Sequence, residues 1–257
     1  AFADWSMPPA EQRSKPMNRL AYLIERDQDQ LAKAEAIDNG KPIALAKQVD
    51  IYRAAANLRF FAQAITQFSS ESHAMENLAI NYTLRDPLGV VACISPWNLP
   101  LYLFTWKIAP ALAAGNTVIA KPSEVTPMTA YLFSKLCIEA GLPPGVLNVL
   151  HGTGPAIGGP LTTHEQVKAI SFTGGSSTGT AIKQATATQH KKLSLELGGK
   201  NPTLVFADCD FEPTVKAVAR AAFANQGQIC LCGSRILIEA SIYDRFTAAL
   251  VTEVEQL

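Results

Sequence analysis

The segment from residue 89 to residue 188 alternates between two sequence patterns, and this alternation is the strongest constraint on the fold. Short runs rich in valine and isoleucine, expected as strands, are separated by longer runs with helical spacing of apolar residues. Short buried strands separated by helices are typical of a parallel sheet covered on both faces. The sequence therefore predicts an α/β fold with a doubly wound, mostly parallel sheet. The expected strands span 89–95, 116–121, 145–152 and 168–174, and the expected helices span 102–115, 129–141 and 178–188.

The segments before and after this region are also patterned. Apolar residues recur at helical spacing from 18 to 65, with a break at Asn39-Gly40. Residues 78–84 then switch to a spacing of two, which is typical of a strand or a hairpin arm, so we expect an excursion from the main body here. Beyond residue 188 we expect further strands within 191–207, a helix that runs into a loop within 211–227, and a last helix with Ser241 and Asp244 as a capping box.

The balance of charge excludes some classes of partner. The 257 residues include 22 Lys and Arg against 22 Asp and Glu, so no basic field favours nucleic acid. Lys107 and Pro110 interrupt the most apolar segment before it reaches the length of a membrane helix. The N-terminal stretch lacks the basic-then-apolar order of a signal peptide. We expect a cytoplasmic protein whose partners are small molecules or protein subunits, not nucleic acid or membranes.

The cysteines do not form a disulfide framework or a metal motif. Their number is odd and they are scattered over a long chain, which favours reduced thiols. No C-x-x-C occurs and the four histidines show no paired spacing, so we expect no metal site. The five cysteines are Cys93, Cys137, Cys209, Cys230 and Cys232.

One glycine-rich stretch is a candidate anion site. The run "FTGGSSTGTAIKQA" follows an expected strand and opens an expected helix, so backbone N–H groups at a helix N-terminus are available to a phosphate. Its glycines are Gly174, Gly175 and Gly179, in a G-x-x-x-x-G spacing that is neither the dinucleotide fingerprint nor a P-loop. The alternative is a tight turn with no ligand. The other glycine cluster, "HGTGPAIGG", contains a proline that removes a backbone donor.

Two charged residues follow the expected strand 116–121. Lys121 and Glu124 come at its carboxyl end, the edge at which open α/β sheets bind ligands. A carboxylate there accepts hydrogen bonds from the hydroxyls of an adenosine ribose and repels a 2′-phosphate. The alternative is a solvated loop with an ion pair.

Glu196 lies on the polar face of an expected strand. In "KKLSLELGGK" the leucines alternate with Ser194 and Glu196, and the glycine pair that follows permits a close approach of ligand or chain. A carboxylate in a cleft can act as a general base. The alternative is the exposed face of a strand.

The two thiols of "FANQGQICLCGSR" receive different interpretations. Cys230 follows a polar, turn-prone stretch, so the loop can present its thiol at the surface while Ile229 and Leu231 anchor the loop. A lone cysteine is more often a small buried hydrophobe, and we assign that role to Cys232.

Four motifs together resemble the NAD(P)-dependent aldehyde dehydrogenase superfamily, in the family's order and spacing. They are "ISPWNLPLYLFTWKIAPALAAGNTVIAKPSEVTP", "SFTGGSSTGT", "LELGGKNP" and "FANQGQICLCGSR". The run "DIYRAAANLRFFA" and the I-C-L-C sequence resemble most the branch that acts on 2-aminomuconate or 2-hydroxymuconate semialdehyde. The resemblance covers essentially the whole chain, but family members are nearly twice as long, so the chain resembles an N-terminal fragment.

The resemblance implies roles for individual residues. Cys230 corresponds to the nucleophile, Glu196 to the general base and Asn98 to the side-chain donor to the oxyanion. Lys121 and Glu124 match the residues that hold the adenosine ribose.

Further positions match the cofactor side of the family's site. Gly174 and Gly179 lie in the turn near the pyrophosphate, and Gly175 stands where serine is common. Trp97, Gly154 and Lys107 match cofactor-side or site-supporting positions.

The resemblance also implies an activity and a domain plan. The protein would oxidise an aldehyde to the acid with NAD, through a thiohemiacetal and a thioester on the cysteine. Residues 1–68 and 88–199 would form a Rossmann-like NAD-binding domain, 69–87 an oligomerisation arm, and 200–257 the start of a second α/β catalytic domain. A full-length protein would be a homodimer or homotetramer.

Two other functions remain open on the sequence. One is a truncated, catalytically incompetent fragment that only binds the cofactor. The other is a cysteine-dependent acyl transferase or hydrolase, which lacks a histidine in a loop motif that would pair with Cys230.

The semialdehyde resemblance implies a cation for the substrate's remote carboxylate. We expect Arg53 to bind it, because a guanidinium can donate two parallel hydrogen bonds to a carboxylate. The alternative is an exposed helical arginine paired with Asp50 at i, i+3.

Overall fold

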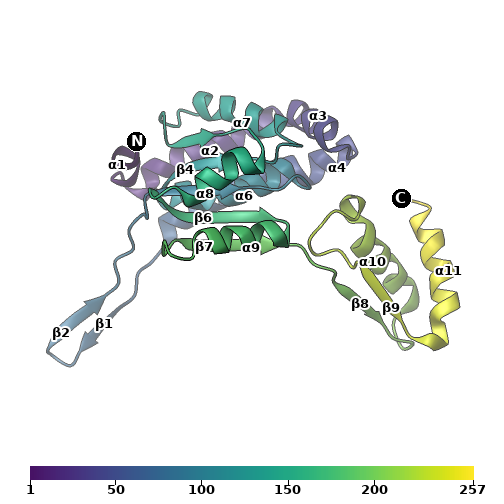
Figure 1. Ribbon diagram of the computed structural model, residues 1–257. Helices are drawn as coiled ribbons and strands as arrows, with labels where there is room; N and C mark the ends of the chain where they lie inside the picture. The colour runs from purple at the N-terminus through teal and green to yellow at the C-terminus, as the bar shows by residue number, and fades with distance from the viewer. The chain divides into compact units, whose positions relative to one another are not determined.

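A five-stranded sheet organises the first of two compact units, Ala1–Glu196 and Leu197–Leu257 (Figure 1). The structure is a computed structural model that describes residues 1–257. The strand order is β5-β4-β3-β6-β7. Strand β3 pairs in parallel with β4 and with β6, and β4 pairs in parallel with β5, so the predicted α/β class is confirmed. The strands are β3 (Val90–Ile94), β4 (Thr117–Lys121), β5 (Leu147–Val149), β6 (Val167–Gly174) and β7 (Lys192–Leu197).

Alternate residues of β3 face two different cores, because successive side chains of a strand point to opposite faces. Val91 and Cys93 belong to a large core built with residues of α2, α5, α6 and α7. Ala92 and Ile94 belong to a smaller core that includes one leucine of α8 and one isoleucine of α9. All four side chains are buried, so the sheet is covered on both faces, as a doubly wound fold requires.

The helices of the first unit match the helical periodicity of the sequence, including the expected break. Helix α3 ends at Asn39 because Gly40 adopts the left-handed conformation, with φ of 81°, that favours glycine at a helix C-terminus. The chain then passes through a short α-helical turn and a π-helical segment, η1 (Ala46–Ile51), before α5 begins.

The helical elements of this unit are α1 (Phe2–Ser6), α2 (Ala10–Arg26), α3 (Gln28–Asn39), α4 (Ile43–Leu45), α5 (Tyr52–Ala64), η2 (Ile65–Gln67), α6 (Pro100–Ala113), α7 (Met128–Glu139), η3 (Gly154–Gly158), α8 (Gly159–Thr163) and α9 (Ser176–Ala185). None of the chain's helices combines the length and the apolar character needed to cross a bilayer.

Residues 72–82 form a hairpin that is separate from the five-stranded sheet (Figure 1). Strands β1 (Ser72–Met75) and β2 (Ala79–Tyr82) pair with each other in antiparallel fashion, and all their residues are exposed. Glu76 and Asn77 make the turn with positive φ angles of 35° and 65°, as tight hairpin turns require. The expected excursion is therefore a two-stranded hairpin, and its second strand covers 79–82 of the expected 78–84.

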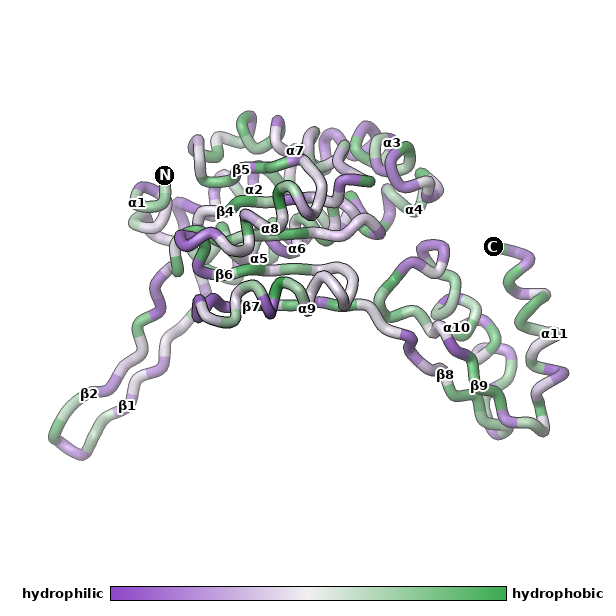
Figure 2. Tube along the Cα trace, in the orientation of Figure 1, coloured by the Kyte–Doolittle hydropathy of each residue, from purple (hydrophilic) through white to green (hydrophobic).

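The second unit contains a small parallel sheet covered by helices. Strands β8 (Pro202–Val205) and β9 (Arg235–Ile238) pair in parallel, and Val205, Val215, Val218 and Phe246 form the centre of the core. Helix α11 alternates between hydrophilic and hydrophobic residues, as expected of a helix with one buried face (Figure 2). The helical elements are α10 (Phe211–Phe223), η4 (Ala224–Gly227), η5 (Ala240–Ile242) and α11 (Tyr243–Val254).

The expected capping box of the last helix is wrong. Helix α11 begins at Tyr243, its N-cap is Ile242, and no side chain caps it. Ser241 lies in the preceding 3₁₀ turn, where its hydroxyl donates instead to Glu239 Oε1 at 2.9 Å.

We predict that Ile108→Ala lowers the free energy of unfolding by about 2 to 5 kcal/mol, because truncating a fully buried isoleucine leaves a cavity. Ile108 lies on α6 and is 0% exposed. The matched control is Ile138→Ala on α7, where the side chain is 79% exposed and the change should stay within about 0.5 kcal/mol. Denaturant titration of both variants measures the difference, and equal losses would contradict the assigned core.

Candidate active site

Three neighbouring parallel strands end at one edge of the sheet, and most of the predicted site residues follow these ends. The register pairs Ile94 of β3 with Lys121 of β4 and with Phe172 of β6, so the three strands end side by side. The loop with Trp97 and Asn98 follows β3, the loop with Glu124 follows β4, and the glycine turn follows β6. Open parallel sheets bind their ligands at this edge.

The structure joins Lys121, Glu124 and Gly154 by hydrogen bonds. Lys121 Nζ donates to Glu124 Oε2 at 2.9 Å, and the Gly154 N–H donates to Glu124 Oε1 at 3.2 Å. A backbone N–H and the Lys121 ammonium lower the pKa of Glu124, so this carboxyl is ionised at neutral pH. The Glu124 side chain is 45% exposed while that of Lys121 is buried. The Glu124 carboxylate therefore presents its negative charge to solvent, and the buried Lys121 side chain holds it from the protein side.

The glycine turn leads from β6 directly into the N-terminus of α9. A Cβ on Gly174 would lie 2.6 Å from the Phe172 ring, so this position excludes a side chain unless the ring moves. Gly175 is the N-cap of α9, with no side-chain cap, and a Cβ there would meet nothing nearer than 4.0 Å. The Gly179 N–H donates to the Gly175 carbonyl at 3.1 Å. The first N–H groups of this helix can therefore donate to an anion.

The loop after β3 is held by the segment that follows α3. Asn39 Nδ2 donates to the Trp97 carbonyl at 2.8 Å, and Lys41 Nζ donates to the Asn98 carbonyl at 3.1 Å. Asn98 is half-buried, whereas Trp97 is 45% exposed. The loop backbone thus has fixed partners while the indole of Trp97 faces solvent.

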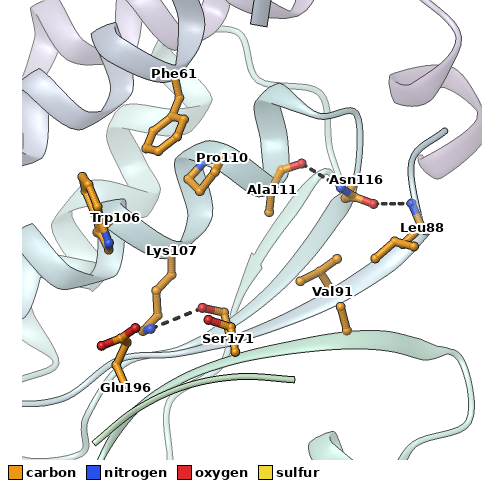
Figure 3. Close-up of a pocket in the computed structure, with 12 residues that line it drawn as sticks. Phe61, Leu88, Val91, Trp106, Lys107, Pro110, Ala111, Asn116, Ser171 and Glu196 are labelled. Atoms are coloured by element: carbon orange, nitrogen blue, oxygen red, sulfur yellow. Dashed lines mark hydrogen bonds between the residues drawn. The ribbon is translucent and has the colours of Figure 1, made fainter. Parts of the chain in front are cut away.

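A cavity of about 360 Å³ lies beside α6, and Glu196 is one of its walls (Figure 3). Lys107 extends into it from α6 and donates to Ser171 Oγ at 3.3 Å. Burial lowers the pKa of Lys107 to about 8, although the nearby Cys93 and Glu196 side chains oppose the shift. In Figure 3 the Glu196 carboxylate lies close to the Lys107 amine. Glu196 and Lys107, both predicted as site residues, are thereby brought together.

The other cavity residues were not predicted as site residues. Ser194 lies two residues before Glu196 on the same strand face. The alternation of polar and apolar residues along this strand could therefore have indicated it from the sequence. Ser171 comes from β6 and is brought there only by the fold. The remaining lining residues are Phe61, Leu88, Val91, Trp106, Pro110, Ala111, Asn116 and Ala169.

The cysteine loop lies in the second unit. Cys230 is exposed and Cys232 is buried, as expected from the sequence. Leu231 is 80% exposed, so the expectation that it anchors the loop is wrong. Asn201 holds the loop instead, because its Nδ2 donates to the carbonyls of Cys230, at 2.6 Å, and Cys232, at 3.2 Å. Sequence reasoning missed Asn201, although it belongs to the "LELGGKNP" motif.

The turn before Cys230 has an unusual backbone. Asn225, Gln226 and Gly227 are consecutive residues with positive φ angles of 50°, 58° and 69°. Non-glycine residues adopt this conformation only where their surroundings stabilise it. The buried Asn225 side chain donates through Nδ2 to the Gln228 carbonyl at 3.3 Å, which closes the turn locally.

Arg53 does not pair with Asp50. Its guanidinium lies over the Tyr102 ring, 5.2 Å from the centroid, and Nη2 is 3.3 Å from the Tyr102 hydroxyl. Asp50 is fully buried and accepts from Lys41 Nζ at 2.8 Å. The alternative of an Asp50–Arg53 ion pair is therefore wrong, and Arg53 is an exposed cation stacked on an aromatic ring. No group of three or more His, Cys, Asp or Glu side chains is placed to hold a metal ion.

Comparisons with known proteins agree with these motifs. The sequence profile of the "Aldehyde dehydrogenase family" matches residues 1–257. The chain is 51% identical over 252 residues to 2-aminomuconic semialdehyde dehydrogenase of Danio rerio, covering 98% of this chain and 52% of that protein. It is 45% identical over 258 residues to 2-hydroxymuconic semialdehyde dehydrogenase of Pseudomonas sp. (strain CF600), covering 98% of this chain and 53% of that protein. The chain thus spans about half the length of these relatives.

A solved structure shows the same likeness. The crystal structure of an indole-3-acetaldehyde dehydrogenase in complex with NAD+ matches with a TM-score of 0.96 at 39% identity. The match covers 99% of this chain and 52% of that one.

We predict that Lys107 makes stability depend on pH. Between about pH 8 and the ordinary lysine value of 10.5, the unfolded chain binds a proton at Lys107 that the folded chain lacks, so the contribution of Lys107 to stability rises with pH. The rise is at most about 1.4 kcal/mol per pH unit, and Lys107→Met should remove it. Cys137 contributes alike in both proteins, and Cys93→Ala is placed in both, because the Lys107 charge also acts on the pKa of Cys93.

Denaturant titrations at about pH 7.5 and about pH 9.5 measure this difference. Lys33→Met, which replaces an exposed lysine of α3, is the matched control and should follow the parent chain. Parallel profiles for the parent and Lys107→Met would contradict the lowered pKa.

Proposed function

This chain belongs to the aldehyde dehydrogenase family, and on that premise we propose that the protein oxidises an aldehyde to the corresponding acid with NAD, using Cys230 as the nucleophile. The observation that carries the proposal is Cys230 itself: an exposed thiol in a loop whose carbonyls are held by Asn201, within a chain that matches the family over its whole length. The cysteine is positioned by its backbone while its sulfur remains accessible.

The first step is addition of the Cys230 thiolate to the aldehyde carbon. The C–S bond forms as the carbonyl π electrons move to oxygen, so a tetrahedral alkoxide develops. Preorganised donors stabilise that charge, and we assign the Asn98 side-chain amide to this role. The Lys41 and Asn39 hydrogen bonds to the loop backbone support the assignment, because they hold the loop that bears Asn98.

The strand edge fits NAD. Bound NAD supplies the hydride acceptor, and loss of hydride from the adduct carbon leaves a thioester on Cys230. The ionised Glu124 carboxylate would accept hydrogen bonds from ribose hydroxyls, and the uncapped N-terminus of α9, with Gly174, Gly175 and Gly179, would donate to the pyrophosphate. Lys121 and Gly154 hold Glu124, and we assign the exposed Trp97 ring to the cofactor side of the site.

The same carboxylate favours NAD over NADP. A 2′-phosphate at this position would meet the Glu124 charge, and repulsion at a partly screened site amounts to about 1 to 4 kcal/mol. The related indole-3-acetaldehyde dehydrogenase structure contains NAD+, which supports the choice.

Glu196 serves as the general base of the second half-reaction. Its carboxylate takes a proton from water as the water oxygen adds to the thioester carbon, and the Cys230 thiolate leaves. The acid product and the free enzyme result. The cavity that Glu196 shares with Lys107 and Ser171 supports this role, since it provides space and polar partners for water.

The domain plan follows from the same premise. We assign NAD binding to residues 1–68 and 88–199, subunit association to the arm 69–87, and the start of the catalytic domain to 200–257. The fully exposed strands of the arm, with unpaired edges, support association into a homodimer or homotetramer.

The substrate is a semialdehyde that bears a carboxylate remote from its aldehyde. Relatives named for 2-aminomuconic and 2-hydroxymuconic semialdehydes, at 51% and 45% identity, support this class. We assign the carboxylate to Arg53, whose guanidinium lies over Tyr102 and is exposed. Stacking fixes the plane of the guanidinium and leaves N–H donors along its edge, as bidentate recognition requires.

We predict that Cys230→Ala abolishes NADH formation in the complete protein that contains these 257 residues, while NAD binding is retained. The alanine removes the sulfur to which we assign the thioester. Cys232→Ala is the matched control from the same loop, and it should keep activity within a few-fold of the parent. Aldehyde-dependent NADH absorbance and NAD titration measure both effects. Substantial turnover by Cys230→Ala would refute the assigned nucleophile.

We predict that Arg53→Ala lowers kcat/KM selectively for aldehydes that bear a carboxylate. A loss of about tenfold corresponds to about 1.4 kcal/mol of lost transition-state stabilisation, and a neutral aldehyde of similar size should be nearly unaffected. Arg59→Ala is the control, because Arg59 lies on the same helix but pairs with Glu25 at 2.7 Å. If Arg53→Ala lowers kcat/KM equally for both aldehydes, the arginine is structural and the substrate assignment fails.

A further inference from the structure

A buried charged cluster lies directly behind the loop that bears Asn98. It consists of Glu35 on α3, Lys41 in the turn after α3, and Asp50 on η1. The side chains of Lys41 and Asp50 are both 0% exposed, with Lys41 Nζ 2.8 Å from Asp50 Oδ2, and Glu35 is also 0% exposed. None of these three residues takes part in the bond changes or proton transfers of the proposed chemistry.

The cluster and its neighbour Asn39 make three hydrogen bonds to the loop. Lys41 Nζ donates to the Asn98 carbonyl at 3.1 Å, and Asn39 Nδ2 donates to the Trp97 carbonyl at 2.8 Å. Glu35 Oε1 accepts from the Leu101 N–H, at the start of α6, at 3.3 Å. The segment from Glu35 to Lys41 therefore fixes the loop backbone from Trp97 to Leu101, at the start of α6.

Both carboxyl groups of the cluster lie where burial disfavours the charged form. Burial, and then the neighbouring Asp50 charge, raise the pKa of Glu35 well above its usual range, although a hydrogen bond with Thr129 opposes the shift. Burial also raises the pKa of Asp50, and Lys41 opposes that shift. Glu35 Oε2 and Asp50 Oδ1 are buried oxygens without a donor. One proton shared by the two carboxyl groups would leave a single negative charge to face the Lys41 ammonium.

Such a cluster is a poor source of stability. Removing an ammonium and a carboxylate from water costs free energy that their attraction often does not recover, and apolar side chains of similar size often stabilise a fold as well. What an apolar cluster cannot do is donate to the Asn98 carbonyl and accept from the Leu101 N–H. The cluster's polar contacts with the loop are thus its distinguishing property.

We propose that Lys41, supported by Asp50 and Glu35, is a positioning residue that fixes the backbone at Trp97 and Asn98 and so orients the Asn98 amide toward the oxyanion. This inference rests on the proposed role of Asn98. An oxyanion donor is effective only when it is oriented before the charge develops, and a small displacement of such a group lowers the rate strongly. Lys41 acts through Asn98 and does not touch the substrate.

A double-mutant cycle in the complete protein tests the proposal. The variants are Lys41→Met, Asn98→Ala and their combination, with single-turnover NADH formation at saturating NAD and aldehyde as the measurement. Asn98→Ala should slow this step by about 10² to 10³, and Lys41→Met by about 10 to 10². The combined variant should be no slower than Asn98→Ala alone, within about twofold. A residue that merely stabilised the fold would not lose its effect when Asn98 is absent.

Three results would overturn the proposal. If Lys41→Met slows the reaction equally with and without Asn98, or not at all, Lys41 does not act through Asn98 while the proposed function stands. If Asn98→Ala leaves the rate unchanged, the oxyanion assignment fails and the proposal fails with it. Lys47→Met is the matched control, because Lys47 lies on the same π-helical segment with an exposed side chain that pairs only with Asp29.

A second cycle decides the question if Lys41→Met does not fold. Asn39→Ala truncates a half-buried residue at the end of α3 and removes only the bond to the Trp97 carbonyl. It should slow the single-turnover step by about threefold to tenfold, and this loss should vanish in the Asn98→Ala background. An undiminished loss in that background, or no loss in the parent, overturns the proposal.

Discussion

The parallel pairing of β3 with β4 on one side and β6 on the other is the constraint on which the rest of the structure depends. In a parallel pair both strands end at the same edge, so loops far apart in the sequence become neighbours there. The loop with Asn98, the loop with Glu124 and the glycine turn at Gly174 are neighbours for this reason. Strand β3 can occupy the centre because its side chains are apolar on both faces.

Three buried lysines near this edge show how the chain handles charge in its interior. Lys41 and Lys121 are each paired with a carboxylate, at 2.8 Å and 2.9 Å. Lys107 instead hydrogen-bonds to the hydroxyl of Ser171, and burial lowers its pKa to about 8. Burial alone disfavours the charged form of an amine, and a nearby carboxylate opposes that effect. For Lys107 the Glu196 carboxylate opposes the shift without cancelling it, so this lysine can exchange its proton near neutral pH.

The sequence predicted those features that depend on local pattern. The strands of the five-stranded sheet, the break at Gly40 and the exposure of Cys230 follow from the residues at or near those positions. Features that depend on contacts between distant segments were either not predicted or predicted wrongly. Asp50 and Lys41 are buried together and pair with each other, whereas Arg53, one helical turn from Asp50, is exposed. Asn201 approaches the cysteine loop only because β8 pairs with β9, and Ser171 meets Lys107 across α6 and β6.

The π-helical segment η1 decides where this region can change in length. A π-helical segment closes its hydrogen bonds over one residue more than an α-helix, so it accommodates one extra residue within nearly the same total rotation. The loss of one residue from this segment can therefore be absorbed by conversion to α-helix, with little rotation of α5. The loss of one residue from the α-helical stretch between Asp50 and Asn57 would instead rotate the two residues apart by about 100°. Either Asp50 would then leave Lys41, or Asn57 would leave the Tyr102 carbonyl that its Nδ2 contacts at 3.1 Å.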